Sequence, residues 1–466
     1  MRHHRAGRDT LRRSLVAWSF LGLISGALFA APSAHELASG LSRLGPRPDG
    51  EKVQEKAVAF LTDALRRAGL QAVRLVPVAG KPSIFNVEGI LPGETDREIV
   101  LSAHYDTVKK SPGAGDDASG CGLAIATAAE LARMPLRHTI RVVLFDGEEK
   151  GLFGSRGWVE ALPSEARDRI LADVNLEMVG WAGSTGPTIH AIPVSLKQGE
   201  DRGERVTTPG WLVRASIHGG RSADWPLHLA DPRFSLPMQL LLRGTRVGFG
   251  ADSGSFLERG IPAVTFSDSS FFVMDPVYHR PADTPVRLDA GRLEAWTCAV
   301  AATVRRLDGL DDRPAAEEDY LVLAGRVWSR WALAGLGLAL AVLLVVRHRL
   351  PRKWHFPVLL AAACVIAPTL AVPLLALPAL LELVRPAGGW QRLLWTLLGL
   401  LPFLLYLFLL AGAFAAGLSS WKAGYQESWT GAVLVIGALL VWSLTPRAST
   451  PRAPAAAAVQ PAPPAS

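Results

Sequence analysis

Hydrophobic and polar positions along the chain follow patterns that predict distinct structural elements. Residues 51–68 carry apolar side chains at helical spacing, including Phe60, Leu61 and Leu65, which predicts an amphipathic helix. Apolar runs that predict buried strands follow at 83–90, 98–103, 140–145, 174–178 and 262–266, with a small-residue helix at 120–134. Between residues 180 and 250 the pattern is weak and predicts mainly loops. The strand–helix–strand alternation indicates an α/β fold with a mostly parallel sheet, whose functional side chains gather at the carboxyl ends of the strands.

A second kind of pattern, the long apolar run, occupies the two ends of the chain. The run from Leu15 to Ala31 is long for a signal-peptide core and short for a comfortable membrane span. Pro32 makes the following small-residue segment a poor cleavage site, so we expect a retained anchor rather than a cleaved signal peptide. Four more runs, at 327–346, 356–384, 393–418 and 429–444, predict a transmembrane region of about four helices.

The loop at 347–353 is the most basic connection between these runs, which places it in the cytoplasm and the α/β domain on the outer face of the membrane. The chain therefore divides into five predicted parts. These are a basic N-terminus with an anchor or signal peptide (1–34), an extracytoplasmic domain (35–310), a juncture (311–326), a transmembrane region (327–444) and a disordered Pro/Ala-rich tail (445–466). The composition favours a bacterial inner membrane with a periplasmic domain, or the endoplasmic-reticulum lumen if the source is eukaryotic.

Net charge changes this picture only when it is divided along the chain. The 466 residues carry a formal net charge of +7, which alone would suggest a polyanionic partner. Residues 14–319 carry −6, whereas the first thirteen residues carry +4 and the residues beyond Asp319 carry +9. The basic excess thus flanks the apolar runs, which argues against nucleic-acid binding and for a lipid bilayer as partner.

Titratable side chains stand at or after the ends of several predicted strands. They are His104 with Asp106, Asp116 with Asp117, Glu148 with Glu149, Glu177, and Tyr278 with His279. Each has an ordinary structural explanation by itself, since an aspartate pair can cap a helix and a glutamate pair suits a solvated turn. Their order, one group after another strand, brings them to one edge of the sheet. Because the three cysteines cannot form a thiolate zinc cluster, any metal there would be held by histidines and carboxylates.

Five separated motifs, from Leu44-Gly-Pro-Arg-Pro-Asp-Gly to the segment around His279, resemble in order the zinc-dependent exopeptidase family of the bacterial leucyl aminopeptidases. This co-catalytic family also includes glutamate carboxypeptidases and glutaminyl cyclases. A domain followed by apolar spans looks most like its membrane-bound branch, typified by endoplasmic-reticulum metallopeptidases. The resemblance implies a sheet sandwiched by helices, two Zn²⁺ ions per chain and a peptide substrate. It further implies that a metal-bridged water attacks the peptide, with a glutamate as general base.

The resemblance also assigns a role to individual side chains. Five would bind the metals: His104 and Glu177 the first zinc, Glu149 and His279 the second, and Asp116 both. Two would act on the substrate, Glu148 as general base and acid and Tyr278 as stabiliser of the tetrahedral oxyanion. Asp106 would orient the imidazole of His104 from behind.

Two departures from the family pattern concern the geometry and the specificity of the site. Glu177 stands where relatives often have aspartate, and its longer arm would alter the ligand geometry. Ser253 stands where the family motif Ser-Asp-His-x-x-Phe has a pocket-lining histidine. An aminopeptidase is the leading prediction; a glutaminyl-cyclase-like transferase and a non-catalytic receptor or scaffold with a peptidase fold are the alternatives. The pair Asp116–Asp117 favours the peptidase, because family cyclases carry Asp-Ser there.

Overall fold

A computed structural model of the chain describes residues 32–48, 50–184, 186–190, 207–229, 239, 251–268, 276–317, 320–348 and 372. Among these residues, the chain divides into two compact units between Ser329 and Arg330. The first unit holds the α/β domain, and each unit is described by itself. The predicted apolar run from Leu15 to Ala31 and the Pro/Ala-rich tail lie outside the described residues.

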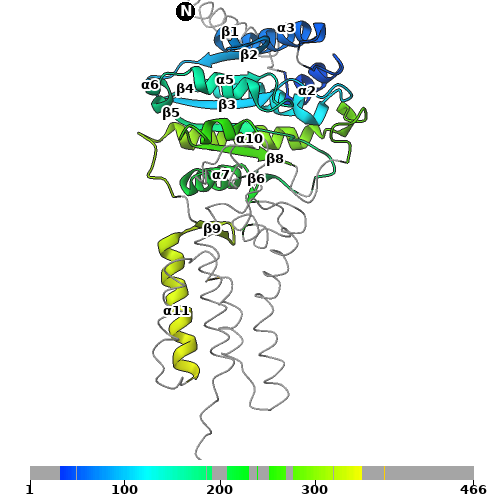
Figure 1. Cartoon of the computed structure of the whole chain (residues 1–466). Coiled ribbons are helices and arrows are strands. Elements are labelled where there is room, and N and C mark those ends of the chain that lie inside the picture. The colour runs from blue at the N-terminus through cyan, green and yellow to red at the C-terminus, as the bar shows by residue number, and fades with distance from the viewer. Residues whose placement is uncertain are drawn as a thin grey trace, which may run out of the picture. The chain divides into compact units, whose positions relative to one another are not determined.

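An eight-stranded mixed sheet forms the centre of the first unit (Figure 1). Its strands are β1 (Gln71–Val78), β2 (Lys81–Leu91), β3 (Glu98–His104), β4 (Thr139–Phe145), β5 (Ile170–Leu176), β6 (Thr188–His190), β7 (His228–Leu229) and β8 (Ala263–Ser267). They are ordered β1-β2-β4-β3-β5-β8-β6-β7 across the sheet. The four central strands, β4-β3-β5-β8, are parallel, whereas β1, β2 and β6 pair antiparallel to their neighbours or to the central strands. The carboxyl ends of the four central strands therefore meet at one edge.

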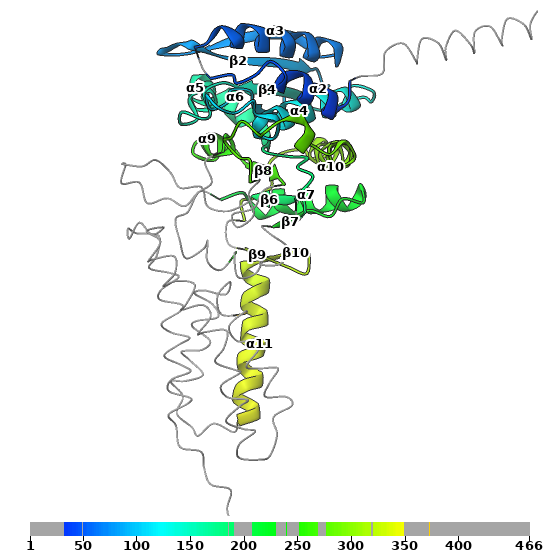
Figure 2. The same ribbon diagram turned by 90° about the vertical axis from the view of Figure 1, so that its right-hand side faces the viewer.

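Helices cover both faces of this sheet (Figure 2). On one face lie α2 (Ala34–Ser42), α3 (Lys52–Arg67), α4 (Ser119–Leu131), α7 (Gly210–Ser222) and α10 (Ala290–Asp308), which share the larger hydrophobic core with the sheet. On the other face, α5 (Phe153–Ala161) and α9 (Ser253–Leu257) contribute to a smaller core around Phe145, Trp158 and Phe256. The short helix α6 (Ser164–Arg169) leads into β5. Every residue of β5 and β8 is buried, including the polar Asp173, Asn175 and Thr265, as expected for central parallel strands covered on both faces.

Helix α2 begins directly after the segment that the sequence assigns to the membrane anchor. Ser33 caps it: the Ser33 hydroxyl accepts the N–H of Glu36, and the Glu36 carboxylate accepts the N–H of Ser33. This reciprocal pair is a capping box, which satisfies two amides that the first turn leaves free. Leu37 and Leu41 anchor the helix in the core.

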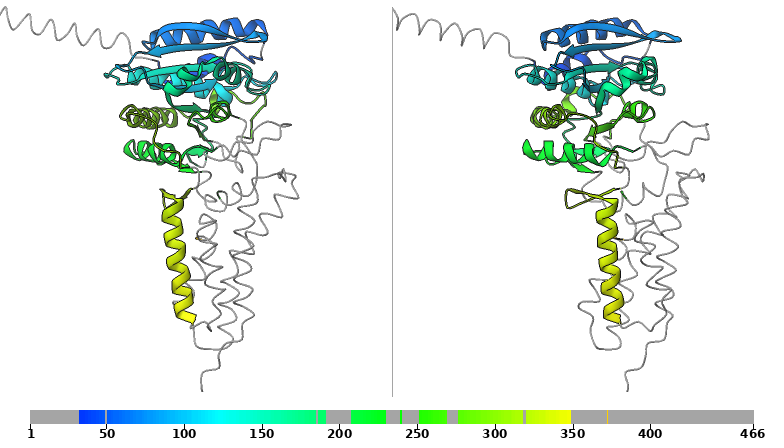
Figure 3. Two further views of the ribbon diagram at one scale, coloured as in Figure 1. Left: turned by 60° about the vertical axis from the view of Figure 1, so that its left-hand side comes forward. Right: turned by 90° about the vertical axis from the view of Figure 1, so that its left-hand side faces the viewer.

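Three further elements differ from the sequence prediction. The segment expected to be loop-rich contains α7, which lies beside α10 (Figure 3). Strand β5 ends at Leu176, so Glu177 follows the strand instead of lying inside it. The predicted juncture contains the first strand of a hairpin, β9 (Tyr320–Leu323), which pairs antiparallel with β10 (Arg326–Ser329).

The second unit begins with α11 (Arg330–His348), which takes up most of the first predicted span. Within the part of the chain that the structure describes, no helix has both the length and the apolar character needed to cross a bilayer. The predicted span at 327–346 is thus unsupported, and its first residues belong to β10. The other three predicted spans lie outside the described residues, apart from the single residue Val372.

Candidate metal centre

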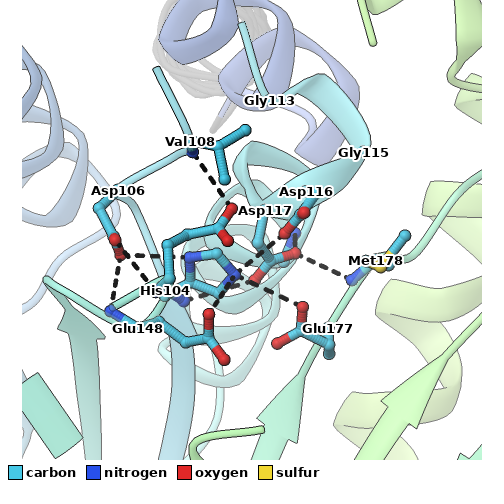
Figure 4. A network of polar contacts seen from close by, with 12 residues as sticks. His104, Asp106, Val108, Gly113, Gly115, Asp116, Asp117, Glu148, Glu177 and Met178 are labelled. Atoms are coloured by element: carbon cyan, nitrogen blue, oxygen red, sulfur yellow. Dashed lines mark hydrogen bonds and ion pairs between the residues drawn. The ribbon is translucent and has the colours of Figure 1, made fainter. Parts of the chain in front are cut away.

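The end of strand β3 places His104 at the carboxyl edge of the sheet with Asp106 two residues beyond it. Both side chains are almost completely buried, and His104 Nδ1 lies 3.3 Å from Asp106 Oδ1. Asp106 also accepts the N–H of Glu148 at 3.1 Å and that of Glu149 at 3.3 Å (Figure 4). One carboxylate therefore contacts the histidine ring, where the sequence expected it, and binds the turn after the neighbouring strand β4.

The loop before α4 carries Asp116 and Asp117, which turn toward different partners. Asp116 Oδ1 lies 3.2 Å from His104 Nε2, and Asp116 Oδ2 lies 3.2 Å from His279 Nε2. Asp117 Oδ1 accepts the N–H groups of Gly120 and Met178, both at 3.0 Å. Asp116 therefore joins two histidines from distant segments, while Asp117 ties the loop to the end of β5.

Two glutamates follow strand β4 and point to different histidines. Glu148 Oε2 lies 4.0 Å from His104 Nε2, whereas Glu149 Oε2 lies 2.9 Å from His279 Nε2. Glu149 Oε1 also accepts the N–H of Val108 at 3.3 Å. The adjacent carboxylates are thus free to serve different roles, as the sequence suggested.

Glu177 and the segment of His279 complete the group. The N–H of Glu177 donates to Phe266 O at 2.9 Å, which holds the residue against strand β8, and its Oε1 lies 3.4 Å from His104 Nε2. The rings of Tyr278 and His279 are stacked, with centroids 3.7 Å apart. His279 is the most exposed of the histidines and carboxylates gathered here, with 36% of its side chain accessible.

Six of these residues form two clusters of three. Within each cluster, the side-chain atoms that could bind a metal lie within 4.8 Å of one another. The inner cluster consists of His104, Asp117 and Glu177, and the outer cluster of Asp116, Glu149 and His279. His104 Nε2, His279 Nε2 and Glu177 Oε2 are buried atoms that have no hydrogen-bond partner among the described residues. Because unsatisfied buried polar atoms are costly, imidazole and carboxylate donors in this state fit a zinc ion.

The structure brings together the nine titratable residues singled out in the sequence. Asp117 lies with the inner cluster, although the sequence supplied no role for it beyond its place in the Asp-Asp pair. Ser253, at the departure from the family motif, is buried, and its hydroxyl hydrogen bonds to that of Thr265 at 2.7 Å. Gly120 is the sequence feature that points to Asp117. Because glycine has no side chain, it leaves room for the Asp117 carboxylate, which would lie 2.3 Å from a Cβ at position 120.

The sequence of this domain is similar to those of known peptidases. Residues 86–209 match the model of peptidase family M28. These residues are therefore similar to peptidase family M28, and we call the α/β domain that contains them the M28 domain. The M28 domain is 26% identical over 209 residues to aminopeptidase YwaD of Bacillus subtilis, a match that covers 44% of this chain and 40% of that relative. It is 29% identical over 208 residues to a probable zinc metalloprotease of Leptosphaeria maculans, covering 40% of this chain and 46% of the relative. The chain thus spans less than half the length of these curated relatives.

Solved structures with a similar chain trace come from both the peptidases and the cyclases. A zinc aminopeptidase from Bacillus subtilis superposes with a TM-score of 0.48 at 18% identity, over 59% of this chain and 94% of that one. A glutaminyl cyclase from Porphyromonas gingivalis gives a TM-score of 0.47 at 20% identity, over 60% of this chain and 98% of that one.

Burial and neighbouring charge perturb the acids of the M28 domain in opposite directions. Burial disfavours the charge on Asp116, but the imidazoles of His104 and His279, each 3.2 Å away, outweigh it and lower the pKa of Asp116 to about 2. Burial, reinforced by Asp116, raises the pKa of Glu149 to about 7. Burial also raises the pKa of Glu177. Asp116 is thus the carboxylate that stays ionised and able to bind cations over the whole ordinary pH range.

The two groups that the sequence assigned to the substrate are perturbed as well. Burial raises the pKa of Glu148 well above its usual range, and the negative charges of Glu177 and Asp252 add to the effect. Burial, with Asp116 and Glu149, likewise raises the pKa of Tyr278, so its hydroxyl stays protonated. Glu148 is therefore suited to hold a proton near neutral pH, and Tyr278 is suited to donate a hydrogen bond.

Proposed function

We propose that the M28 domain is a zinc-dependent exopeptidase, and specifically an aminopeptidase that hydrolyses N-terminal residues from peptides with two zinc ions. The observation that carries the proposal is the carboxylate of Asp116, whose two oxygens lie 3.2 Å from His104 and 3.2 Å from His279. A single acid between two histidine-containing clusters is the arrangement that lets two cations share one ligand. Bound zinc supplies Lewis acidity to the scissile carbonyl and to the attacking water.

The residues of the chain would divide the work of binding and proton transfer. His104, Asp116, Glu149, Glu177 and His279 would hold the two ions, and Asp106 would keep the His104 ring in place through its Oδ1, 3.3 Å from Nδ1. Asp117 would complete the inner cluster, or hold the loop through the backbone N–H groups that its carboxylate accepts, those of Gly120, Met178 and His104.

Glu148 would be the proton carrier of the reaction. Its carboxylate lies 4.0 Å from His104 Nε2, beside the inner cluster, and retains some access to solvent. Its raised pKa allows it to accept a proton from the attacking water and to pass that proton to the leaving amine. The hydroxyl of Tyr278, protonated and next to His279, would donate to the oxyanion that forms at the scissile carbonyl.

The test is to purify the full chain, measure its zinc content, and assay aminoacyl, carboxyl-terminal and N-terminal-Gln substrates. We expect two zinc ions per chain and aminopeptidase activity. Glu148→Gln should keep its zinc and lose about 10²–10⁴-fold in turnover, the usual contribution of a general base or acid. Glu165→Gln, an exposed change on α6, is the matched control and should be fully active.

Three results would contradict the proposal. Fewer than one zinc per chain or full activity in Glu148→Gln would exclude the mechanism. Cyclisation of N-terminal Gln without peptide hydrolysis would favour a glutaminyl-cyclase-like transferase instead.

We further propose that the domain works on the outer side of a membrane. The support comes from sequence alone, namely the apolar runs and the basic residues that flank them. Fractionation of cells after carbonate washing tests the membrane attachment, and protease treatment of intact cells tests the side on which the domain lies.

A further inference from the structure

Several backbone carbonyl groups of the loop that leads from His104 to Asp116 bind the fully buried side chain of Arg47. The guanidinium of Arg47 donates to three carbonyl oxygens of this loop: Nε to Tyr105 at 2.8 Å, Nη1 to Pro112 at 2.7 Å and Nη2 to Gly113 at 3.2 Å. A buried charge is stable only when its donors are satisfied, and here backbone oxygens do so. Arg47 thereby fixes the path of the loop between the two ligands.

The same loop meets a buried carboxylate on its amide side. Asp283 Oδ1 accepts the N–H of Gly115 at 2.7 Å, and Asp283 Oδ2 accepts the N–H of Asp116 at 3.2 Å. The main-chain oxygen of Asp283 accepts the N–H of Ala114 at 3.2 Å. The side chain of Asp283 is 2% exposed, so these charge-assisted bonds are made away from water and are correspondingly strong.

Asp283 also belongs to the segment that presents His279. Asp283 follows His279 by four positions in the sequence, and His279 Nε2 lies 3.2 Å from Asp116 Oδ2. The segment therefore holds Asp116 at two points, the side chain through His279 and the backbone through Asp283. These two contacts together set the position of Asp116 relative to His279.

We propose that Asp283 is a positioning residue of the metal centre, which fixes the backbone of Asp116 so that its carboxylate faces both histidines. This inference rests on the proposed zinc-dependent function. Asp283 itself belongs to neither cluster and acts through Asp116. Its two oxygens each accept one of two adjacent N–H groups, whereas an asparagine would turn a donor NH2 group toward one of them.

The experiment measures zinc affinity of the full chain by competition with a chromogenic chelator. Asp283→Asn should bind zinc about 10–100-fold more weakly than wild type, as is typical when a residue that orients a ligand is changed. The visible absorption bands of the cobalt-loaded protein should shift in Asp283→Asn, because the ligand geometry changes. The matched control is Asp289→Asn, in which an exposed aspartate that accepts the N–H of Arg292 at 2.9 Å caps α10 away from the clusters. That control should bind zinc within twofold of wild type.

A second variant keeps the test decisive if Asp283→Asn folds poorly. In Gly115→Ala the added methyl group would lie 3.2 Å from Asp283 Oδ1, so it presses on the contact without removing it, and we expect several-fold weaker zinc binding. Zinc affinity and cobalt spectra equal to wild type in the Asp283 and Gly115 variants would overturn this inference alone. A wild-type chain that binds no zinc would overturn the proposed function and this inference with it.

Discussion

The inner and outer clusters of the metal centre use the same chemistry but are built from different parts of the fold. The inner cluster is attached to the sheet: His104 ends β3, and Glu177 follows β5 and bonds to β8 through its N–H. The outer cluster depends on loops, since His279 comes from a segment outside the sheet and 36% of its side chain is exposed. His279 also has φ near 58°, a backbone conformation that non-glycine residues adopt only when their surroundings hold them there. The comparison teaches that the inner cluster inherits its geometry from the sheet, whereas the outer one must be held by loop contacts.

Removing one histidine from each cluster should give the largest effect and the clearest distinction. We expect His104→Ala to lose most zinc from both clusters, because His104 lies at the end of β3 and Asp116, which would serve both ions, contacts His104 as well as His279. His279→Ala should retain about one zinc per chain. Turnover should fall by ~100-fold or more in both, since loss of a ligand exceeds the cost of losing a residue that only orients one. Zinc content after gel filtration checks this, and equal zinc loss in both variants would remove the distinction between the clusters.

Adding a methyl group beside each cluster should give a smaller but still unequal effect. A Cβ on Gly120 would lie 2.3 Å from Asp117 Oδ2 and 2.4 Å from Leu176 O, so the inner site would have to move. We expect Gly120→Ala to lower the free energy of unfolding by about 1–3 kcal/mol, the usual cost of overpacking. Gly115→Ala, beside the outer cluster, should lower it by less than ~1 kcal/mol, because its tightest contact, 3.2 Å to Asp283 Oδ1, requires a shift of only a few tenths of an ångström. Denaturant unfolding measures both, and similar losses would show that the loop is as rigid as the sheet edge.

The smallest expected effect is a dependence of stability on pH in the metal-free protein. Burial raises the pKa of Glu149 to about 7 and that of Glu177 above its usual range, and a hydrogen bond to Asp116 raises that of His279. For each group the folded state binds protons more tightly than the unfolded state, so stability falls as pH rises. The Tm of the metal-free chain should therefore decrease between pH 5 and pH 8.

Zinc should reverse this trend, because the ions bind the deprotonated ligands and their affinity rises with pH. Melting curves with and without zinc at the two pH values provide the measurement. A metal-free Tm that rises over the same interval would show that the raised pKa values do not govern stability.

Sequence reasoning succeeded where a pattern reflects burial and failed where it reflects packing between distant elements. The apolar runs of β3 and β4 are legible because parallel strands are buried on both faces, and the polar residues that follow them mark the site. Helix α7 was missed because Gly219 and Gly220 interrupt its apolar pattern. The structure explains Gly219: a Cβ there would lie 2.2 Å from the Thr303 hydroxyl, so the glycine permits close approach to α10.

The site was predicted more completely than the elements around it, since ligand types are few and their order after strands is informative. Strand β1 was missed because its apolar and polar residues do not alternate; it lies at the edge of the sheet and most of its residues are exposed. The roles of Asp117 and Asp283 depend on which backbone N–H groups come within reach of each carboxylate. Spacing along the chain does not contain that information.

The capping box of α2 has a practical consequence for anyone who wishes to express the α/β unit by itself. At the amino-terminal end, helix α2 packs so closely on α4 that a Cβ on Gly122 would lie 2.4 Å from Ala34 O. At the other end, Tyr320 of β9 is buried and its hydroxyl donates a hydrogen bond to Thr208 O. A shortened chain that starts after Ser33 would lose the cap of α2, and one that ends before Ser329 would expose the core that the β9–β10 hairpin covers. The start and stop points of a well-behaved fragment therefore lie before Ser33 and after Ser329.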